Sequence, residues 1–256
     1  MTRLAVTGAG GRMGREVIEA AGKREDVDVV LAVNRSEIDS VAGVAVDDAA
    51  DFPTLLTERD PDVVVDFTGP ESSAEYVSAC AEAGVAVVVG TTGFDEDGEA
   101  ALDDASEQIP LLKAANFARG VAALRQAVRE AVGALPGYDV ELMETHHNGK
   151  RDAPSGTANS ILDDIEDVRS DLTHRTHGRE GDQPREEGEI GVHARRAGDI
   201  TGEHEVLVAG NHELLSLTHR AESRGVFAEG ALDAAVWVAD CDAGRYDFFD
   251  VIDANQ

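Results

Sequence analysis

Short valine-rich runs alternate with segments of helical character through the first half of the chain, and this alternation limits the possible folds more than any other feature. Helices are expected over 12–21, 71–83 and 96–107. The runs assigned to strands are "RLAVTG" (3–8), "VDVVLAV" (27–33), "DVVVDFT" (62–68), "VAVVVG" (85–90) and "PLLKAA" (110–115). Continuous apolar strands separated by helices are typical of a parallel sheet covered on both faces. The sequence therefore predicts an α/β domain with a doubly wound parallel sheet.

The pattern changes after Asn116 and predicts a second α+β domain. A long amphipathic helix fits 118–134, and the polar stretch 169–188 is expected to be a mobile loop. An apolar helix over 226–240 is expected to return to the first domain. Longer strands with alternating polar and apolar residues fit 138–146, 189–197, 203–210 and 213–222, the last two joined as a hairpin. We therefore expect an open mixed sheet with helices on one face.

A glycine-rich stretch, "VTGAGGRMGRE" (6–16), follows the first strand and opens the first helix. Its spacing is Gly8-x-x-Gly11-x-x-Gly14, with Met13 where the usual dinucleotide fingerprint has glycine. Glycines here allow a tight turn and let backbone N–H groups approach a pyrophosphate at the positive end of the helix. A purely structural glycine turn is the alternative. The context favours a Rossmann-type dinucleotide-binding domain made of 1–117 and 226–256, with a second domain over 118–225.

The end of the second strand bears on the choice of cofactor. A dinucleotide site often has a carboxylate here for the ribose 2′-hydroxyl, whereas a nearby arginine suits a 2′-phosphate. The chain has Asn34 and Arg35, and no acid until Glu37. This arrangement favours NADPH over NADH, although Arg35 could equally be a solvated loop residue, so both cofactors stay open.

The charge of the chain indicates an unusual solvent. The formal net charge is −29, from 51 acidic and 22 basic residues, and only Lys23, Lys113 and Lys150 are lysines. At about 1 M salt the Debye length falls to roughly 3 Å and the repulsion is largely screened. The composition therefore resembles that of cytoplasmic proteins from salt-adapted organisms that hold molar salt inside the cell. An ordinary acidic protein is the alternative. Nucleic acid and membranes are not expected as partners, since no basic patch and no long apolar run is present. The two cysteines, Cys80 and Cys241, form no metal or disulfide framework.

The stretch "METHHNGKRDAPSGTA" (143–158) concentrates titratable groups. If the preceding strand continues, His146 and His147 point to opposite faces, so they do not readily share a metal, and no metal site is expected. An imidazole suits proton transfer near neutrality, and Lys150 can lose a proton where arginine cannot. Ser155 is a candidate N-cap of a helix whose first N–H groups would bind an anion. A capped surface helix with solvated histidines is the alternative.

These segments together resemble the 4-hydroxy-tetrahydrodipicolinate reductase (dihydrodipicolinate reductase) family of the diaminopimelate route to lysine. The similarity covers nearly the whole chain, in family order, and the His-His-x-x-Lys-x-Asp-Ala-Pro-Ser-Gly-Thr segment is its most specific part. The similar segments are "GAGGRMGRE", "DFTGPESS", "VGTTGF", "AANF", "ETHHNGKRDAPSGTA", "RAGDITGEHEV" and "THRAESRGVFAEGA".

The resemblance implies an NAD(P)H-dependent oxidoreductase that reduces a dipicolinate-type cyclic imine, a small dicarboxylate, and that forms a homotetramer through its second domain. His146 would be the general acid/base and Lys150 a proton donor. Substrate would be bound by His147, Ser155, Gly156 and Thr157. Cofactor would be bound by Gly8, Ala9, Gly10, Gly11, Arg12, Met13, Asn34, Arg35, Gly90, Thr91, Thr92, Ala114, Ala115, Asn116 and Phe117. Arg119 departs from the usual family sequence after "AANF", and Asn34 stands where many members have an acid.

Two other classes of function remain at this point. A non-catalytic dinucleotide sensor would keep the glycine loop but would not need His146 and Lys150. A metal-dependent hydrolase using His146 and His147 would need a further ligand that the sequence does not place beside them.

Overall fold

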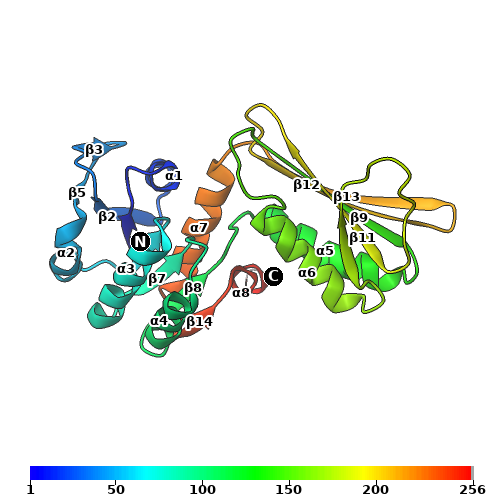
Figure 1. Ribbon diagram of the computed structural model, residues 1–256. Helices are drawn as coiled ribbons and strands as arrows, with labels where there is room; N and C mark the ends of the chain where they lie inside the picture. The colour runs from blue at the N-terminus through cyan, green and yellow to red at the C-terminus, as the bar shows by residue number, and fades with distance from the viewer. Residues whose placement is uncertain (255–256) are drawn as a thin grey trace. The chain divides into compact units, whose positions relative to one another are not determined.

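The computed structural model describes residues 1–254, which divide into two compact units (Figure 1). Unit 1 consists of Met1–Ala118 together with the chain from Arg224 onward, and unit 2 of Arg119–Ser223. Among residues 1–254, no helix combines the length and the hydropathy needed to span a bilayer.

Unit 1 is built on a seven-stranded sheet in which every neighbouring pair is parallel. The strand order is β14 (Gly244–Tyr246), β8 (Pro110–Lys113), β7 (Ala86–Val89), β6 (Val63–Asp66), β1 (Thr2–Thr7), β2 (Val27–Asn34) and β5 (Asp47–Asp48). The chain leaves β1 to one side for β2 and returns to the other side for β6. This reversal is the switch point at which doubly wound sheets bind ligands, and the predicted fold class is confirmed.

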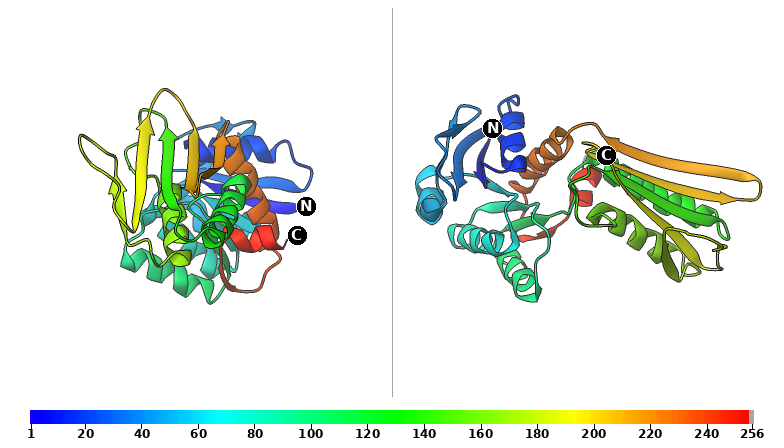
Figure 2. Two further views of the ribbon diagram at one scale, coloured as in Figure 1. Left: turned by 90° about the vertical axis from the view of Figure 1, so that its right-hand side faces the viewer. Right: turned by 45° about the horizontal axis from the view of Figure 1, so that its top comes forward.

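Helices cover both faces of this sheet (Figures 1 and 2). On one face, α1 (Arg12–Ala21) packs against α7 (Gly225–Val238), as expected for the apolar helix near the end of the chain. On the other face, α3 (Pro70–Ala83) packs between α2 (Phe52–Arg59) and α4 (Glu96–Ser106). The hydrophobic core on this face contains alternate residues of the strands packed against the helices. It includes Val64 and Val87 from the sheet and Val77 and Leu102 from the helices. The remaining elements are β3 (Ser40–Val41), β4 (Val44–Ala45), a 3₁₀ turn (Ala49–Asp51) and α8 (Phe248–Asp253).

Unit 2 is a five-stranded mixed sheet with its helices on one face (Figure 2). The order is β10 (His174–His177), β11 (Glu189–Arg196), β9 (Asp139–His146), β12 (Gly202–Gly210) and β13 (Glu213–Ala221). The first three strands are parallel, and β12 is antiparallel to both of its neighbours. Helices α5 (Arg119–Ala134) and α6 (Gly156–Val168) pack on the sheet through an aliphatic core that includes Val128, Leu142 and Ile161.

The expectation of a mobile loop over 169–188 is wrong in part, because strand β10 lies within it. His174–His177 pair in parallel with the first half of β11 and form the edge of the sheet. An edge strand can carry polar side chains on much of its surface, which conceals it from a search for apolar alternation. Arg175 holds this strand to α6 through ion pairs with Asp163 at 2.7 Å and Glu166 at 2.6 Å.

Candidate active site

The glycine loop of unit 1 has the geometry that the sequence predicted. Gly8 has a φ of +64°, which favours glycine, and the N–H of Gly11 donates to the carbonyl of Gly8 at 2.8 Å. A Cβ added to Gly14 would lie 2.3 Å from that carbonyl oxygen. Ala9 is buried and its N–H donates to the carbonyl of Val33 at 3.0 Å. The loop thus brings the start of α1 close to the carboxyl ends of β1 and β2.

Asn34 supports this loop from the end of β2. Its Oδ1 accepts the N–H of Gly10 at 3.1 Å, and its Nδ2 donates to the carbonyl of Ser36 at 2.8 Å. A Cβ at Gly10 would lie 2.2 Å from the terminal methyl of Ile38, so a larger residue there would displace that side chain. Arg35 follows as an exposed residue. Gly11, the N-cap of α1, supplies no side-chain oxygen, so the first N–H groups of the helix remain suited to an anion.

A cavity of about 240 Å³ lies over the carboxyl ends of β6 and β7 and the start of α1. The predicted residues Arg12, Met13, Gly90, Thr91 and Thr92 line it, together with Phe67, Thr68, Gly69 and Pro70, which were not among the predicted site residues. These four directly follow a buried parallel strand, the position at which such sheets bind ligands, so their place in the sequence was a usable signal. The glycine loop and this cavity fit a dinucleotide pyrophosphate and the groups next to it.

Asp66 connects the segments beneath this cavity by hydrogen bonds. Its side chain is fully buried at the end of β6. Oδ1 accepts the hydroxyls of Thr7 at 2.6 Å and Thr68 at 2.7 Å, and Oδ2 accepts the hydroxyl of Thr91 at 2.7 Å. Three hydroxyl donors offset the cost of burying the carboxyl group. Thr68 and Thr91, both in the cavity wall, are therefore positioned by one side chain.

The predicted segment Ala114–Phe117 follows β8, two strands away from β6 in the sheet. The N–H of Ala114 donates to the carbonyl of Val89 at 3.1 Å, and Oδ1 of Asn116 accepts the N–H of Ala118 at 2.8 Å. The ring of Phe117 is buried between Phe67 and Phe248, with ring centroids 5.6 and 5.4 Å away. Phe117 thus packs against Phe67, which lines the cavity. Because the Phe117 side chain is buried, only its backbone could contact the cofactor.

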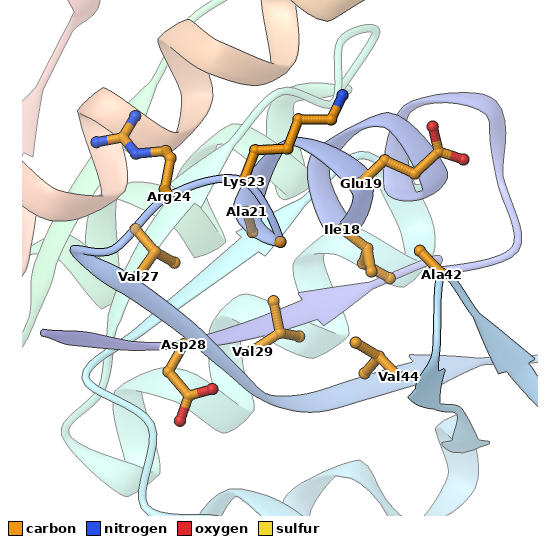
Figure 3. Close-up of a pocket in the computed structure, with 11 residues that line it drawn as sticks. Ile18, Glu19, Ala21, Lys23, Arg24, Val27, Asp28, Val29, Ala42 and Val44 are labelled. Carbon is orange, nitrogen blue, oxygen red and sulfur yellow. The ribbon is translucent and has the colours of Figure 1, made fainter.

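A larger hollow in unit 1, about 560 Å³, lies elsewhere (Figure 3). The end of α1, the start of β2 and the turn between β3 and β4 line it, and Ile18, Val29 and Val44 point into it. Lys23 is at its rim. The amino end of β2 forms part of the wall of this hollow, whereas Asn34 is at the carboxyl end of the same strand. The hollow therefore lies at the opposite end of β2 from Asn34. Parallel sheets bind ligands at their carboxyl ends, so this hollow is not the dinucleotide site.

In unit 2, His146 is the last residue of β9 and is 9% exposed. Its Nδ1 lies 2.6 Å from Oε2 of Glu144, which is fully buried. Burial lowers the pKa of His146 below its ordinary value, although the hydrogen bond to Glu144 acts in the opposite sense. His146 is therefore neutral near pH 7 and able to accept a proton. Glu144 was not predicted, because a carboxylate at an apolar strand position gives no sign of its partner in the sequence.

Lys150 and the start of α6 together hold a carboxylate, that of Asp152. The Nζ atom of Lys150 lies 2.9 Å from Oδ1 of Asp152. Burial acts against ionisation, but hydrogen bonds from Lys150 and from the backbone of Gly156 lower the pKa of Asp152. A Cβ added to Gly156 would meet nothing within 4 Å, so there is open space beside this residue at the start of α6. Lys150, predicted as a proton donor, thus already binds a carboxylate of the chain next to the predicted substrate-binding residue Gly156.

Ser155 is the N-cap of α6, as the sequence predicted. Its Oγ accepts the N–H of Ala158 at 3.1 Å and lies 3.1 Å from Nε2 of His204. His204 lies on β12 with its ring centroid 5.3 Å from that of His146. Burial and the neighbouring His146 lower the pKa of His204 to about 4, so it is neutral. His147 is half-buried in the loop after β9, and Thr157 lies in the first turn of α6.

A cavity of about 770 Å³ in unit 2 does not belong to this arrangement. Its wall includes Pro154, Met143, His193 and Arg195. Side chains alternate along a strand, so Met143 faces the side of the sheet opposite to Glu144 and His146. Residues 1–254 contain no group of three or more His, Cys, Asp or Glu side chains placed to hold a metal ion.

Unit 1 combines a doubly wound parallel sheet with a glycine turn at the start of α1, and unit 2 places a carboxylate-binding segment beside a neutral histidine. These features together define a dinucleotide-dependent oxidoreductase that acts on an anionic substrate. Comparisons with known proteins agree. The description "Dihydrodipicolinate reductase, N-terminus" matches residues 2–117, and "Dihydrodipicolinate reductase, C-terminus" matches residues 120–252. The chain belongs to the dihydrodipicolinate reductase family, whose N-terminal domain is the NAD(P)H-binding domain.

Its similarity to individual proteins extends over the full length. The chain is 58% identical to 4-hydroxy-tetrahydrodipicolinate reductase of Haloarcula marismortui, covering 99% of this chain and 100% of that one. It is 57% identical to the enzyme of the same name from Natronomonas pharaonis, covering 97% and 99%. Both organisms are halophilic archaea, which agrees with the salt adaptation inferred from the charge. Among solved structures, dipicolinate-bound dihydrodipicolinate reductase from Paenisporosarcina sp. TG-14 matches with a TM-score of 0.79 and 26% identity, covering 96% and 97%.

Proposed function

We propose that this chain reduces a 4-hydroxy-tetrahydrodipicolinate-type cyclic imine to tetrahydrodipicolinate with NAD(P)H, in the diaminopimelate pathway of lysine biosynthesis. The observation that carries the proposal is the 2.9 Å pairing of the Asp152 carboxylate with Lys150 just before the start of α6, in the same segment as His146. A dicarboxylate substrate needs such a cradle, and a reduced ring needs a proton beside the carbon that receives hydride. Family membership and the dipicolinate bound to a structural relative support the substrate class.

The cofactor-binding part of the proposal rests on unit 1. The glycine loop and the start of α1 would hold the pyrophosphate through Gly8, Ala9, Gly10, Gly11, Arg12 and Met13. Asn34 and Arg35 would lie at the adenosine ribose, and Gly90, Thr91, Thr92 and the Ala114–Phe117 backbone at the nicotinamide end. NAD(P)H supplies hydride when bound. Asp66 would keep the threonine hydroxyls of this region in fixed positions.

The proton-handling part of the proposal rests on His146 and Lys150. Reduction of a conjugated imine adds hydride to one ring carbon and shifts the electron pair toward nitrogen, after which a neighbouring carbon takes a proton. Lys150 carries protons that it can donate to the ring, and its charge attracts the substrate carboxylate. His146, neutral and with Nδ1 engaged by Glu144, has its other nitrogen available to receive or return a proton. One net proton is therefore delivered for each hydride, supplied by Lys150 and relayed through Nε2 of His146 as general acid/base.

Substrate binding would use the start of α6 and the loop before it. The N–H groups of Gly156 and Thr157 point from the positive end of the helix, and Ser155 and His147 flank them. A substrate carboxylate would take the place of Asp152 on Lys150 and Gly156. The second carboxylate of a dipicolinate-type ring would then be bound by the remaining groups of this segment.

We also propose a homotetramer and a cytoplasmic location. The five-stranded sheet ends in β13, an edge strand with Leu214 62% exposed and Leu215 38% exposed. Exposed apolar edge strands favour pairing with another subunit. Both cysteines are free, which suits a reducing compartment. Light scattering in molar KCl would give four times the mass of the 27.0 kDa chain if the assembly is correct.

One assay tests the proposed activity against its alternatives. Purified protein in molar KCl is mixed with NADPH and freshly generated 4-hydroxy-tetrahydrodipicolinate, and the absorbance of the reduced nicotinamide is followed. A substrate-dependent decrease supports the reductase. Tight NADPH binding without turnover would identify a dinucleotide sensor. Substrate loss without oxidation of NADPH, abolished by chelators, would identify a metal-dependent hydrolase and contradict the proposal.

A further inference from the structure

We propose that Glu144 is a positioning residue of this reductase, which fixes the tautomer and orientation of His146 and at the same time holds the start of α6. This inference rests on the proposed role of His146 as the proton-accepting group. It adds a residue that the sequence did not indicate, and it predicts effects that differ from those of losing His146 itself.

The surroundings of Glu144 show that it acts as an acceptor of hydrogen bonds. Its carboxylate is fully buried on β9. Arg196, the last residue of β11, donates from Nη1 to Oε2 at 2.8 Å and from Nη2 to Oε1 at 2.7 Å. The backbone N–H of Ser155 donates to Oε1 at 3.1 Å. Burial disfavours the ionised form, but hydrogen bonds from Arg196 and His146 lower the pKa of Glu144 overall, so it is ionised.

An ionised carboxylate accepts hydrogen bonds and donates none. The proton in the 2.6 Å contact between Glu144 and His146 therefore belongs to Nδ1 of the imidazole. Neutral His146 then carries its lone pair on Nε2. A Cβ added to Gly202 of β12 would lie 3.1 Å from this atom, so glycine at 202 keeps the approach to Nε2 clear. The carboxylate thus orients the imidazole so that its basic nitrogen lies beside Gly202, in the way that carboxylates orient catalytic histidines.

Glu144 also stabilises the protonated form of His146. The groups that face the imidazole are Glu144 on the same strand, Arg196 on β11, His204 on β12 and Lys150 in the loop. Burial and the two cations disfavour the imidazolium, and Glu144 alone among them favours it. Removing the negative charge would leave His146 able to face the substrate but poorly able to hold a proton.

The same carboxylate ties the histidine to the substrate-binding helix. Its Oε1 accepts the N–H of Ser155, whose Oγ caps α6. Arg196 completes the link, since its Nη2 also donates to the carbonyl of Asp152 at 2.6 Å. One partly buried ion pair, Glu144–Arg196, therefore connects the end of β9, the loop 147–155 and the first turn of α6. Such a shared anchor keeps the proton acceptor and the carboxylate cradle at a constant separation.

The test uses the full-length protein in molar KCl and the isosteric variant Glu144→Gln. Its control is Glu189→Gln, which alters another buried carboxylate, 2% exposed, at the end of β11 opposite to Arg196. The Glu189 carboxylate pairs with Arg179 and accepts the N–H of Glu186 at 3.1 Å. We expect Glu144→Gln to lower kcat by about 10²- to 10⁴-fold with a smaller change in KM, and to move the acidic limb of the pH–kcat/KM profile to lower pH. Glu189→Gln is expected to keep wild-type kcat and pH profile.

A double-mutant cycle separates positioning from a general loss of structure. If Glu144 acts through His146, Glu144→Gln lowers kcat much less in a His146→Ala background than in the wild type. Additive losses in the two backgrounds would overturn the proposal. So would wild-type kcat and pH profile in Glu144→Gln while His146→Ala is slow, a result that leaves the proposed function intact. Wild-type turnover in His146→Ala would instead refute the proposed role of the histidine.

A measurement on the wild type covers the case in which Glu144→Gln does not fold. Selective ¹⁵N labelling of histidine and long-range ¹H–¹⁵N correlation report which ring nitrogen carries the proton. We expect the Nδ1–H tautomer for His146 at pH 7 to 8. Finding the Nε2–H tautomer would overturn the proposal, whatever the fate of the variant.

Discussion

The Nζ atom of Lys150 and Oδ1 of Asp152 lie 2.9 Å apart, so the lysine proposed to meet the substrate is already paired within its own loop. Asp152 also interacts with the backbone of Gly156, the other half of the proposed cradle. An incoming carboxylate therefore competes with a carboxylate of the protein. In the proposed binding mode, Asp152 would keep the cradle formed and would compete with the substrate for it.

We expect Asp152→Asn to lower KM for the dicarboxylate about two- to fivefold, because the neutral amide competes less well and exposed ion pairs contribute up to about 1 kcal/mol. Steady-state kinetics in molar KCl would measure this. Asp163→Asn is the matched control, since Asp163 is also exposed and paired, with Arg175 at 2.7 Å on the same helix side of unit 2. An unchanged or higher KM in Asp152→Asn would mean that Asp152 supports Lys150 more than it competes with substrate.

His146→Ala and Lys150→Ala should each lower kcat by about two to four orders of magnitude, the usual range for a positioned acid or base. Lys150→Arg keeps the positive charge but cannot release a proton, so it should preserve KM better than kcat. Initial rates at saturating NADPH would show the difference. Turnover close to wild type in both alanine variants would contradict the assignment of proton transfer to this segment.

Arg35→Ala should weaken the binding of NADPH more than that of NADH, because only NADPH carries the 2′-phosphate. A well-formed charge-assisted hydrogen bond contributes roughly 1.5–3 kcal/mol. Arg35 is exposed, so molar salt should reduce the effect. Dissociation constants measured by fluorescence titration at two KCl concentrations would test this. Equal weakening of both cofactors would show that another group makes the distinction.

High ionic strength should be required for folding and activity, given a formal net charge of −29. Dilution of salt removes screening of the carboxylates and should cause unfolding or subunit dissociation. Moderate acidification at low salt should restore compactness only in part, because paired carboxylates such as Glu144 and Asp171 are stabilised in their ionised form. Circular dichroism and light scattering across KCl concentrations would decide. A constant melting temperature and particle mass from dilute buffer to molar KCl would contradict this expectation.

Acid should destabilise the fold through His204. Burial and the neighbouring His146 lower its pKa from 6.5 to about 4, so between these values the unfolded chain binds more protons. The contribution to stability, roughly 3 kcal/mol, is complete above pH 6.5 and is lost as the pH falls toward 4. His146, His219, Glu144 and Lys150 also influence this histidine. Melting temperatures at fixed molar KCl should fall less steeply with acid in His204→Asn than in wild type or in His177→Asn, which alters an exposed histidine. Identical acid slopes in all three proteins would exclude His204 as the source.

The glycine turn, the parallel strands and the capped helix at Ser155 could be predicted because each depends on local sequence. Gly8 needs a positive φ, Val63–Asp66 form a buried run, and Ser155 precedes a helical segment. The positions of Phe67 and Thr68 could also have been predicted, since they follow a buried strand in a doubly wound sheet.

The partners of Asp66, Glu144 and Asn34 could not be read from the sequence. Glu144 binds Arg196, which is 52 residues away, and Asp66 binds Thr7, which is 59 residues away. Such pairs depend on the register between strands, which a single sequence does not specify in detail. Strand β10 was missed for a similar reason, because its backbone pairing with β11 stabilises it more than apolar side chains do.

One face of the unit 1 sheet is covered by α7, a helix that is synthesised only after the whole of unit 2. Helix α7 packs on α1, β6, β7 and β8, yet unit 2 separates it in the chain from all four. The first 118 residues therefore emerge during synthesis with the face beneath α7 uncovered, including the apolar contacts of Ala231, Ala234 and Val238. Unit 2, by contrast, is continuous in the chain. A chain that terminates early within unit 2 would lack the cover for the dinucleotide-binding sheet, so premature termination anywhere before α7 should yield a protein that aggregates and does not retain cofactor binding.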